Sequence, residues 1–204
     1  MPGSVSCPLD QQGPIRANSG FWIGQFKMEP NFMLKKKILK ALNEQINAEM
    51  YSAYLYLSME SYFQSISLGG FATWMRGQVQ EELAHAMKFY DFVGERGGRV
   101  LLDTIKKPVS TWESPLAAFE HILQHEQLVT GLINDLVDLA EKEKDHATRI
   151  FLQWFVTEQV EEEASVGEIV DKLELIKDNS SGLFLLDAEL AKRAFTLPGS
   201  SESA

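Results

Sequence analysis

The sequence is poor in the residues that make covalent cross-links or membrane-spanning segments. Its 204 residues contain one cysteine, Cys7, so neither an intrachain disulfide nor a CxxC metal site can form. No apolar run reaches the roughly 18 residues of a transmembrane helix. The first 30 residues also lack the apolar core of a secretory signal. We therefore expect a cytoplasmic protein without a membrane partner.

Positive charge is scarce as well. Lys and Arg number 19 against 29 Asp and Glu, which gives a formal net charge of -10. Such a balance repels phosphate backbones, so we expect no nucleic-acid partner. An acidic chain suits cations better, although excess charge is usually a solvated surface. The positions of the carboxylates must decide between these interpretations.

Proline and glycine are concentrated at the start of the chain. Residues 1–30 hold four of the seven prolines and four of the fourteen glycines, a density that breaks helices and strands alike. We interpret 1–30 as a flexible N-terminal extension, 31–195 as one domain, and 196–204 as a flexible C-terminal tail.

The domain shows the spacing of long helices. Apolar residues recur every three or four positions with few breaks, and no useful β-alternation competes. The expected helices cover 31–63, 71–95, 115–144, 145–177 and a short 183–195. A long connection at 99–113 lets the second and third helices run parallel. The sequence thus predicts an all-α four-helix bundle with a long crossover and a short fifth helix.

Each long helix places carboxylates inside its own apolar stripe, on the face that should meet the core. The inward set is Glu49, Glu82, Glu126, Glu158 and Glu162, with His85 three residues after Glu82. An ionised carboxylate in the interior costs several kcal/mol unless something compensates it. Lys and Arg are absent from the stripes, whereas a metal cluster would neutralise all these groups. Oxygen ligands with one imidazole suit iron, manganese or zinc, and Glu-x-x-His is typical of di-metal bundles.

Three further polar residues flank this set. Glu81 either belongs to a secondary ion site or faces solvent, while Gln159 and Glu161 sit at the edges of the fourth stripe. Gln159 is placed to hydrogen-bond a metal-bound water or oxygen species.

Aromatic and histidine residues near the stripes also have two interpretations. Tyr56 and Trp154 either pass electrons to a metal-bound oxidant or simply fill the core. His121 and His125 fit a surface or a subunit contact better than a metal site, because Glu126 takes the inward position.

Four stretches together resemble the non-haem ferritins of bacteria and archaea, over about residues 33–195. They are Ala48–Leu57 (AEMYSAYLYL), Gln80–Ala86 (QEELAHA), His125-Glu126 and Trp154–Glu163 (WFVTEQVEEE). The family forms hollow cages of 24 subunits, oxidises Fe²⁺ with O₂ or peroxide, and stores ferric mineral inside. The resemblance implies the same ferroxidase and storage functions for this chain.

The resemblance also implies a ligand set for a di-iron centre inside one subunit. The first iron would be held by Glu49, Glu82 and His85, with Glu82 bridging to the second. The second would be held by Glu126 and Glu162, with Gln159 close by. A third, lower-affinity site would use Glu81, Glu158, Glu161 and Glu162, and Tyr56 would lie beside the centre.

Related classes fit the sequence less well. Haem-containing bacterioferritins carry a second Glu-x-x-His on the fourth helix and a Met after the bridging Glu. Here the corresponding positions are 158–162 (EQVEE) and Leu83, so we expect no haem. Two rivals stay open: a small di-metal oxidase or peroxidase, and a cage without iron chemistry. The intact ligands Glu49, Glu82 and His85 argue against the second.

Overall fold

The computed structural model describes residues 34–177 and 179–193, and this part of the chain forms five helices and no strand. The all-α prediction is confirmed. The proposed extension 1–30 and tail 196–204 lie outside the described residues.

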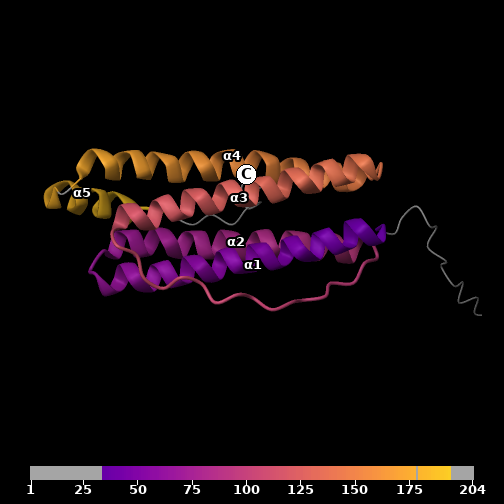
Figure 1. The fold of residues 1–204 in the computed structure, drawn as a ribbon, viewed down its shortest axis with the longest axis horizontal. Helices are drawn as coiled ribbons and strands as arrows, with labels where there is room; N and C mark the ends of the chain where they lie inside the picture. The colour runs from indigo at the N-terminus through magenta and orange to yellow at the C-terminus, as the bar shows by residue number, and fades with distance from the viewer. Residues whose placement is uncertain (1–33, 178, 194–204) are drawn as a thin grey trace, which may run out of the picture.

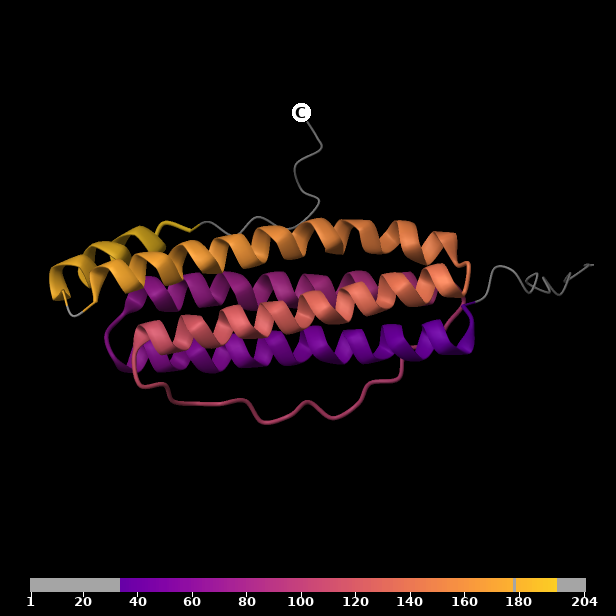
Figure 2. The same cartoon turned by 45° about the horizontal axis from the view of Figure 1, so that its top comes forward.

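The helices form an elongated bundle of two antiparallel pairs (Figures 1 and 2). Their bounds are α1 Lys36–Ser65, α2 Gly69–Glu95, α3 Pro115–Lys142, α4 His146–Ile176 and α5 Ser180–Leu190. α1 pairs with α2 and α3 pairs with α4, while the connection at 99–113 runs along the bundle. The connection brings the chain back to the end of the bundle where α2 begins. As a result α2 and α3 run parallel, as the sequence predicts.

Local capping chemistry sets several of the helix ends. The Ser114 side chain accepts a hydrogen bond from the Ala117 amide at 3.1 Å, and Pro115 occupies the first turn, where its missing N–H is not needed. Beyond α2, Gly97 adopts φ 68°, the left-handed conformation that glycine enters without steric cost. These signals are local, which is why the sequence reveals them.

The fifth helix differs from its prediction. It begins at Ser180, before the predicted start at Leu183, and it ends at Leu190, before the predicted end. The Asn179 side chain accepts hydrogen bonds from the amides of Ser181 and Gly182, at 3.0 and 3.1 Å, so it caps the helix earlier.

The helix α2 also begins earlier than predicted, because a side chain of α5 caps its first turn. Oδ1 of Asp187 accepts hydrogen bonds from the amides of Gly70 and Phe71, at 2.7 and 3.0 Å. A Cβ atom at Gly70 would lie 1.7 Å from the Asp187 carbonyl oxygen. Glycine is therefore required where the α5 backbone meets α2, and the helix begins before Phe71.

Two aromatic clusters form the core, one toward each end of the bundle. Phe63, Phe71 and Phe119 belong to one cluster, and Phe89 and Phe155 belong to the other. Each such burial stabilises the bundle by roughly 1.5–3 kcal/mol relative to exposure. Between these clusters along all four long helices lies a layer of buried polar side chains.

Candidate metal centre

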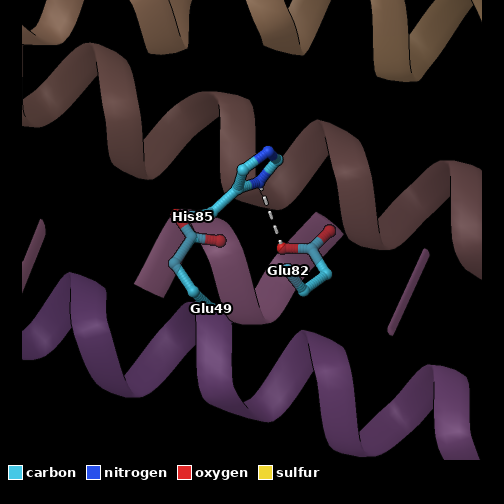
Figure 3. Close-up of side chains that lie close together, drawn as sticks. All are labelled: Glu49, Glu82 and His85. Carbon is cyan, nitrogen blue, oxygen red and sulfur yellow. Dashed lines mark ion pairs between the residues drawn. The ribbon is translucent and has the colours of Figure 1, made fainter. Parts of the chain in front are cut away.

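The α1 and α2 side of this polar layer brings together Glu49, Glu82 and His85. The three side chains point toward one another (Figure 3), and the residues are 2%, 3% and 2% exposed. Nδ1 of His85 lies 3.5 Å from Oε2 of Glu82. One ligand atom from each residue lies within 4.8 Å of the other two, so the group can hold a metal ion.

His85 belongs to a second group of the same kind on its other side. One ligand atom each from His85, Glu158 and Glu162 again lies within 4.8 Å of the others. Nε2 of His85 is 3.8 Å from Oε1 of Glu158. The imidazole therefore has α4 carboxylates on one side and the α1–α2 carboxylates on the other.

Neutral donors orient the carboxylates of the centre. Tyr56 donates its hydroxyl hydrogen to Glu126 on α3, and the Gln159 amide lies 3.3 Å from Oε2 of the same carboxylate. Gln78 donates to Oε2 of Glu162 at 2.9 Å. Gln45 holds Glu49 in the same way, also at 2.9 Å. Amide and hydroxyl donors fix the carboxylate positions without cancelling their charge.

Two atoms of the centre have no hydrogen-bond partner although they are buried. They are Oε2 of Glu49 and Nε2 of His85. An unsatisfied buried polar atom costs about 1–3 kcal/mol, so such atoms call for a ligand. A carboxylate-rich donor set with one imidazole fits iron, manganese or zinc. The residues present therefore fit a metal ion.

Three carboxylates of the centre have raised pKa values, so they hold their protons to higher pH than an exposed glutamate does. Burial raises the pKa of Glu82 well above its ordinary value. Burial, and then repulsion from Glu162, raises the pKa of Glu126 to about 8. Burial also raises the pKa of Glu162 to about 6, with repulsion from Glu81 adding to it. A cation bound in the centre would displace these protons and neutralise the carboxylates in their place.

The pKa of His85 is also raised, but for a different reason. Burial disfavours the imidazolium, but the neighbouring carboxylates of Glu158 and Glu82 outweigh it and raise the pKa of His85 to about 11. The ring is thus a proton-bearing partner of the carboxylates until a metal replaces that proton.

The profile of the family described as "Ferritin-like domain" matches residues 39–176. The chain belongs to the ferritin family. This confirms the resemblance drawn from the sequence, and the matched range contains every residue of the polar layer described above.

Curated bacterial ferritins resemble the chain along nearly their whole length. A bacterial non-heme ferritin of Bacteroides fragilis is 47% identical over 161 residues, covering 79% of this chain and 100% of that protein. One from Campylobacter jejuni is 44% identical over 155 residues, covering 76% and 93%.

A solved archaeal ferritin is similar in both sequence and fold. The open pore ferritin of Archaeoglobus fulgidus is 60% identical, with a TM-score of 0.78. The match covers 79% of this chain and 98% of that one. Ferritin membership supports iron binding and a role in iron storage. None of the helices in the described residues is long and apolar enough to cross a membrane.

The structure corrects the order of burial on α4 of this ferritin. The sequence placed Glu158 inward and Gln159 on the flank, but Gln159 is 5% exposed while the Glu158 side chain is 24% exposed. Leu152 is fully buried and its neighbour Phe151 only partly, so the inward face of α4 is centred nearer Gln159 than Glu158. Glu158 still reaches His85 from the edge of the centre.

The two outer acidic residues have different surroundings. Glu81 pairs with Arg193, which follows α5, at 2.6 Å, so it does not face solvent freely. Arg193 lies outside the four apolar stripes, so the cation at this edge comes from a segment that the stripes do not include. Glu161 is exposed and belongs to neither group of candidate ligands in the described residues. Its assignment to a third site stays a prediction.

The two α3 histidines also differ from each other. His125 is partly buried against α1: its Nε2 lies 2.8 Å from the Ser52 hydroxyl, and its ring meets those of Tyr51 and Tyr56 edge-on. Burial lowers its pKa to about 4. Because Glu126 points into the bundle, its neighbour His125 lies at the edge of the buried face, where it contacts α1.

Proposed function

We propose that this ferritin is a ferroxidase whose di-iron centre lies within a single subunit. The observation that carries the proposal is the convergence of buried ligand side chains from all four long helices. Glu49, Glu82 and His85 would hold one iron, with Glu82 bridging. Glu126 and Glu162 would hold the second, next to Gln159.

The donor set suits oxidation of the bound substrate iron. Hard, anionic oxygen ligands stabilise Fe³⁺ more than Fe²⁺, so they favour loss of an electron. Two ions held side by side supply two electrons, one each, to O₂ or peroxide. With O₂ the products are two Fe³⁺ and, after uptake of two protons, H₂O₂. The ferric ions then leave for storage as mineral, and no haem is required.

We further propose that the chain assembles into a cage of 24 subunits. Large apolar side chains are exposed along α1, α2 and the connection at 99–113. They include Tyr54, Leu57, Tyr90, Leu101 and Leu102, the last 74% exposed. Soluble monomers rarely leave such patches in water, so these surfaces favour burial against other subunits.

Oxidation in air tests the ferroxidase function. We expect metal-free protein mixed with Fe²⁺ to develop ferric absorbance at least about tenfold faster than buffer does. Glu126→Gln should lose most of that gain, since a buried ligand is neutralised. The matched control is Glu120→Gln, which changes an exposed carboxylate on the same helix. Equal loss in both variants, or a wild-type rate no faster than buffer, would contradict the proposal.

Particle size separates storage from the rival di-metal oxidase. Light scattering should give a mass near twenty-four times 23.0 kDa, and electron microscopy should show a hollow particle that fills with dense core after iron loading. A monomer or dimer that still oxidises iron would favour the small oxidase.

A further inference from the structure

Two facing pairs of side chains connect α3 with α4 beside the metal centre. Glu126 and Thr130 lie four residues apart on α3, so they share one face of that helix. Gln159 and Glu163 have the same spacing on α4. The pairs meet where Nε2 of Gln159 lies 3.2 Å from Oγ1 of Thr130. Neither Thr130 nor Glu163 is among the proposed ligands of the centre.

The Thr130 hydroxyl determines which end of the Gln159 amide faces it. This hydroxyl donates to Oε1 of Glu163 at 2.5 Å. Because its single hydrogen is used there, it can only accept from the Gln159 amide nitrogen. The same NH₂ group lies 3.3 Å from both Oε2 and the main-chain oxygen of Glu126. The amide nitrogen, and not the amide oxygen, is thus turned toward the carboxylate of the centre.

The partners of this amide differ in their distance from the chemistry. Gln159 is buried, so its orientation depends on protein groups more than on solvent. One partner, Glu126, is itself a proposed ligand, and its carboxylate must adjust when a metal ion binds. The other partner, Thr130, is half-buried and is held in turn by the half-buried Glu163. The amide therefore has an anchor outside the ligand set.

We propose that Thr130 and Glu163 are positioning residues that hold Gln159 as a hydrogen-bond donor to Glu126 and not as a metal ligand. The inference rests on the proposed di-iron function. An amide binds hard metal ions through its oxygen, which here is turned away from Glu126. Tyr56 donates to the other oxygen of Glu126, so neutral donors hold both carboxylate oxygens. A carboxylate fixed in advance loses less freedom when it binds the second metal ion.

Calorimetric titration of the full-length, metal-free protein with Zn²⁺ tests this role without iron oxidation. The wild type should bind two Zn²⁺ per subunit. Thr130→Val should weaken the second by about tenfold and leave the first within about twofold, because valine keeps the shape but cannot accept from Gln159. Thr130→Ser should restore binding, since it keeps the hydroxyl. The matched control is Thr157→Val, which removes an exposed α4 hydroxyl that donates to the main-chain oxygen of Gln153. It should bind both ions as the wild type does.

A double variant shows whether Thr130 acts through Gln159. Gln159→Leu removes the amide and should weaken the second Zn²⁺ by about tenfold or more. Adding Thr130→Val to it should cause no further loss, since the group through which Thr130 acts is gone. Glu163→Ala should cause a smaller loss, of about threefold, because the hydroxyl remains but its hydrogen is free to turn toward the amide.

The outcomes distinguish this role from the proposed function. Two bound Zn²⁺ ions of which Thr130→Val weakens neither would overturn the role of Thr130 and Glu163 alone. Equal weakening of both ions, no rescue by Thr130→Ser, or a full further loss in the double variant would do the same, because the hydroxyl would then act through packing. A wild type that does not bind two Zn²⁺ would overturn both proposals together.

Discussion

The middle of the bundle and its α3–α4 turn use carboxylates in opposite ways. At the turn, Asp145 meets Arg96 through two hydrogen bonds, at 3.1 and 3.2 Å, and also caps α4 by accepting from the Thr148 amide. In the middle, Glu82 and Glu126 meet other carboxylates, an imidazole and neutral donors. Both regions are built by the same four helices.

The pKa values record the difference. Burial would raise the pKa of Asp145, but hydrogen bonds from Arg96 and Thr148 outweigh it and hold the pKa below its ordinary value. Burial raises the pKa of Glu126 to about 8 because nothing of opposite charge outweighs it. A carboxylate with a built-in cation stabilises the fold, whereas one without it is available to a metal ion.

The largest expected effect comes from removing a central carboxylate. Glu82→Gln should slow the oxidation of Fe²⁺ by about 100-fold or more, because the proposed bridging ligand loses its charge. The metal-free variant should also melt higher than the wild type at pH 8, since Glu82 must take up a proton or bury a charge on folding, whereas Gln does neither. Stopped-flow absorbance and thermal melting check the two parts. Oxidation at the wild-type rate would remove Glu82 from the centre.

Removing Asp145, the carboxylate paired with Arg96, should lower the stability of the fold but leave iron oxidation nearly unchanged. Asp145→Ala breaks the ion pair with Arg96 and the α4 cap, a loss of about 2–4 kcal/mol. The melting temperature should fall by roughly 5–10 °C, while iron oxidation stays within about twofold of the wild type. A large loss of oxidation with little loss of stability would reverse the contrast between the two regions.

The pH dependence of stability should also separate the regions. Because the folded-state pKa of Glu126 is raised from 4.5 to about 8, its contribution is fully present below pH 4.5 and is lost as pH rises through about 8. The metal-free protein should therefore melt lower at pH 9 than at pH 6. Saturating Zn²⁺ should remove most of this decline, which paired melting curves would reveal. An identical decline with Zn²⁺ would contradict the assignment.

The smallest effect is expected from Tyr56→Phe. The change keeps the ring in the core but removes the hydroxyl that donates to Glu126. A net loss of about 1 kcal/mol in positioning should weaken Zn²⁺ binding by about fivefold. Calorimetry measures this directly, with Tyr62→Phe as the control, since the Tyr62 ring packs against Phe63 and Trp112 and makes no contact with Glu126. Equal effects in both variants would mean that Tyr56 acts through packing alone.

Helical periodicity and local capping signals were enough to predict the bundle and most of the candidate ligands. Helical periodicity places Glu49, Glu82, Glu126 and Glu162 on inward faces because side chains three or four residues apart share a direction. Caps such as Ser114 and the glycine at 97 are local signals, so they too can be read from the chain. The parallel course of α2 and α3 follows from the length of the connection between them.

Features that depend on contacts between distant segments could not be predicted from the sequence. Glu158 and Gln159 are neighbours at the edge of the buried face, and packing against α3 buries the second more deeply. Arg193 is 112 residues from Glu81 in sequence, so no helical pattern connects them. The α2 cap likewise comes from Asp187 on α5. Periodicity specifies which face of a helix is buried, whereas the partner of each buried charge depends on how the helices pack.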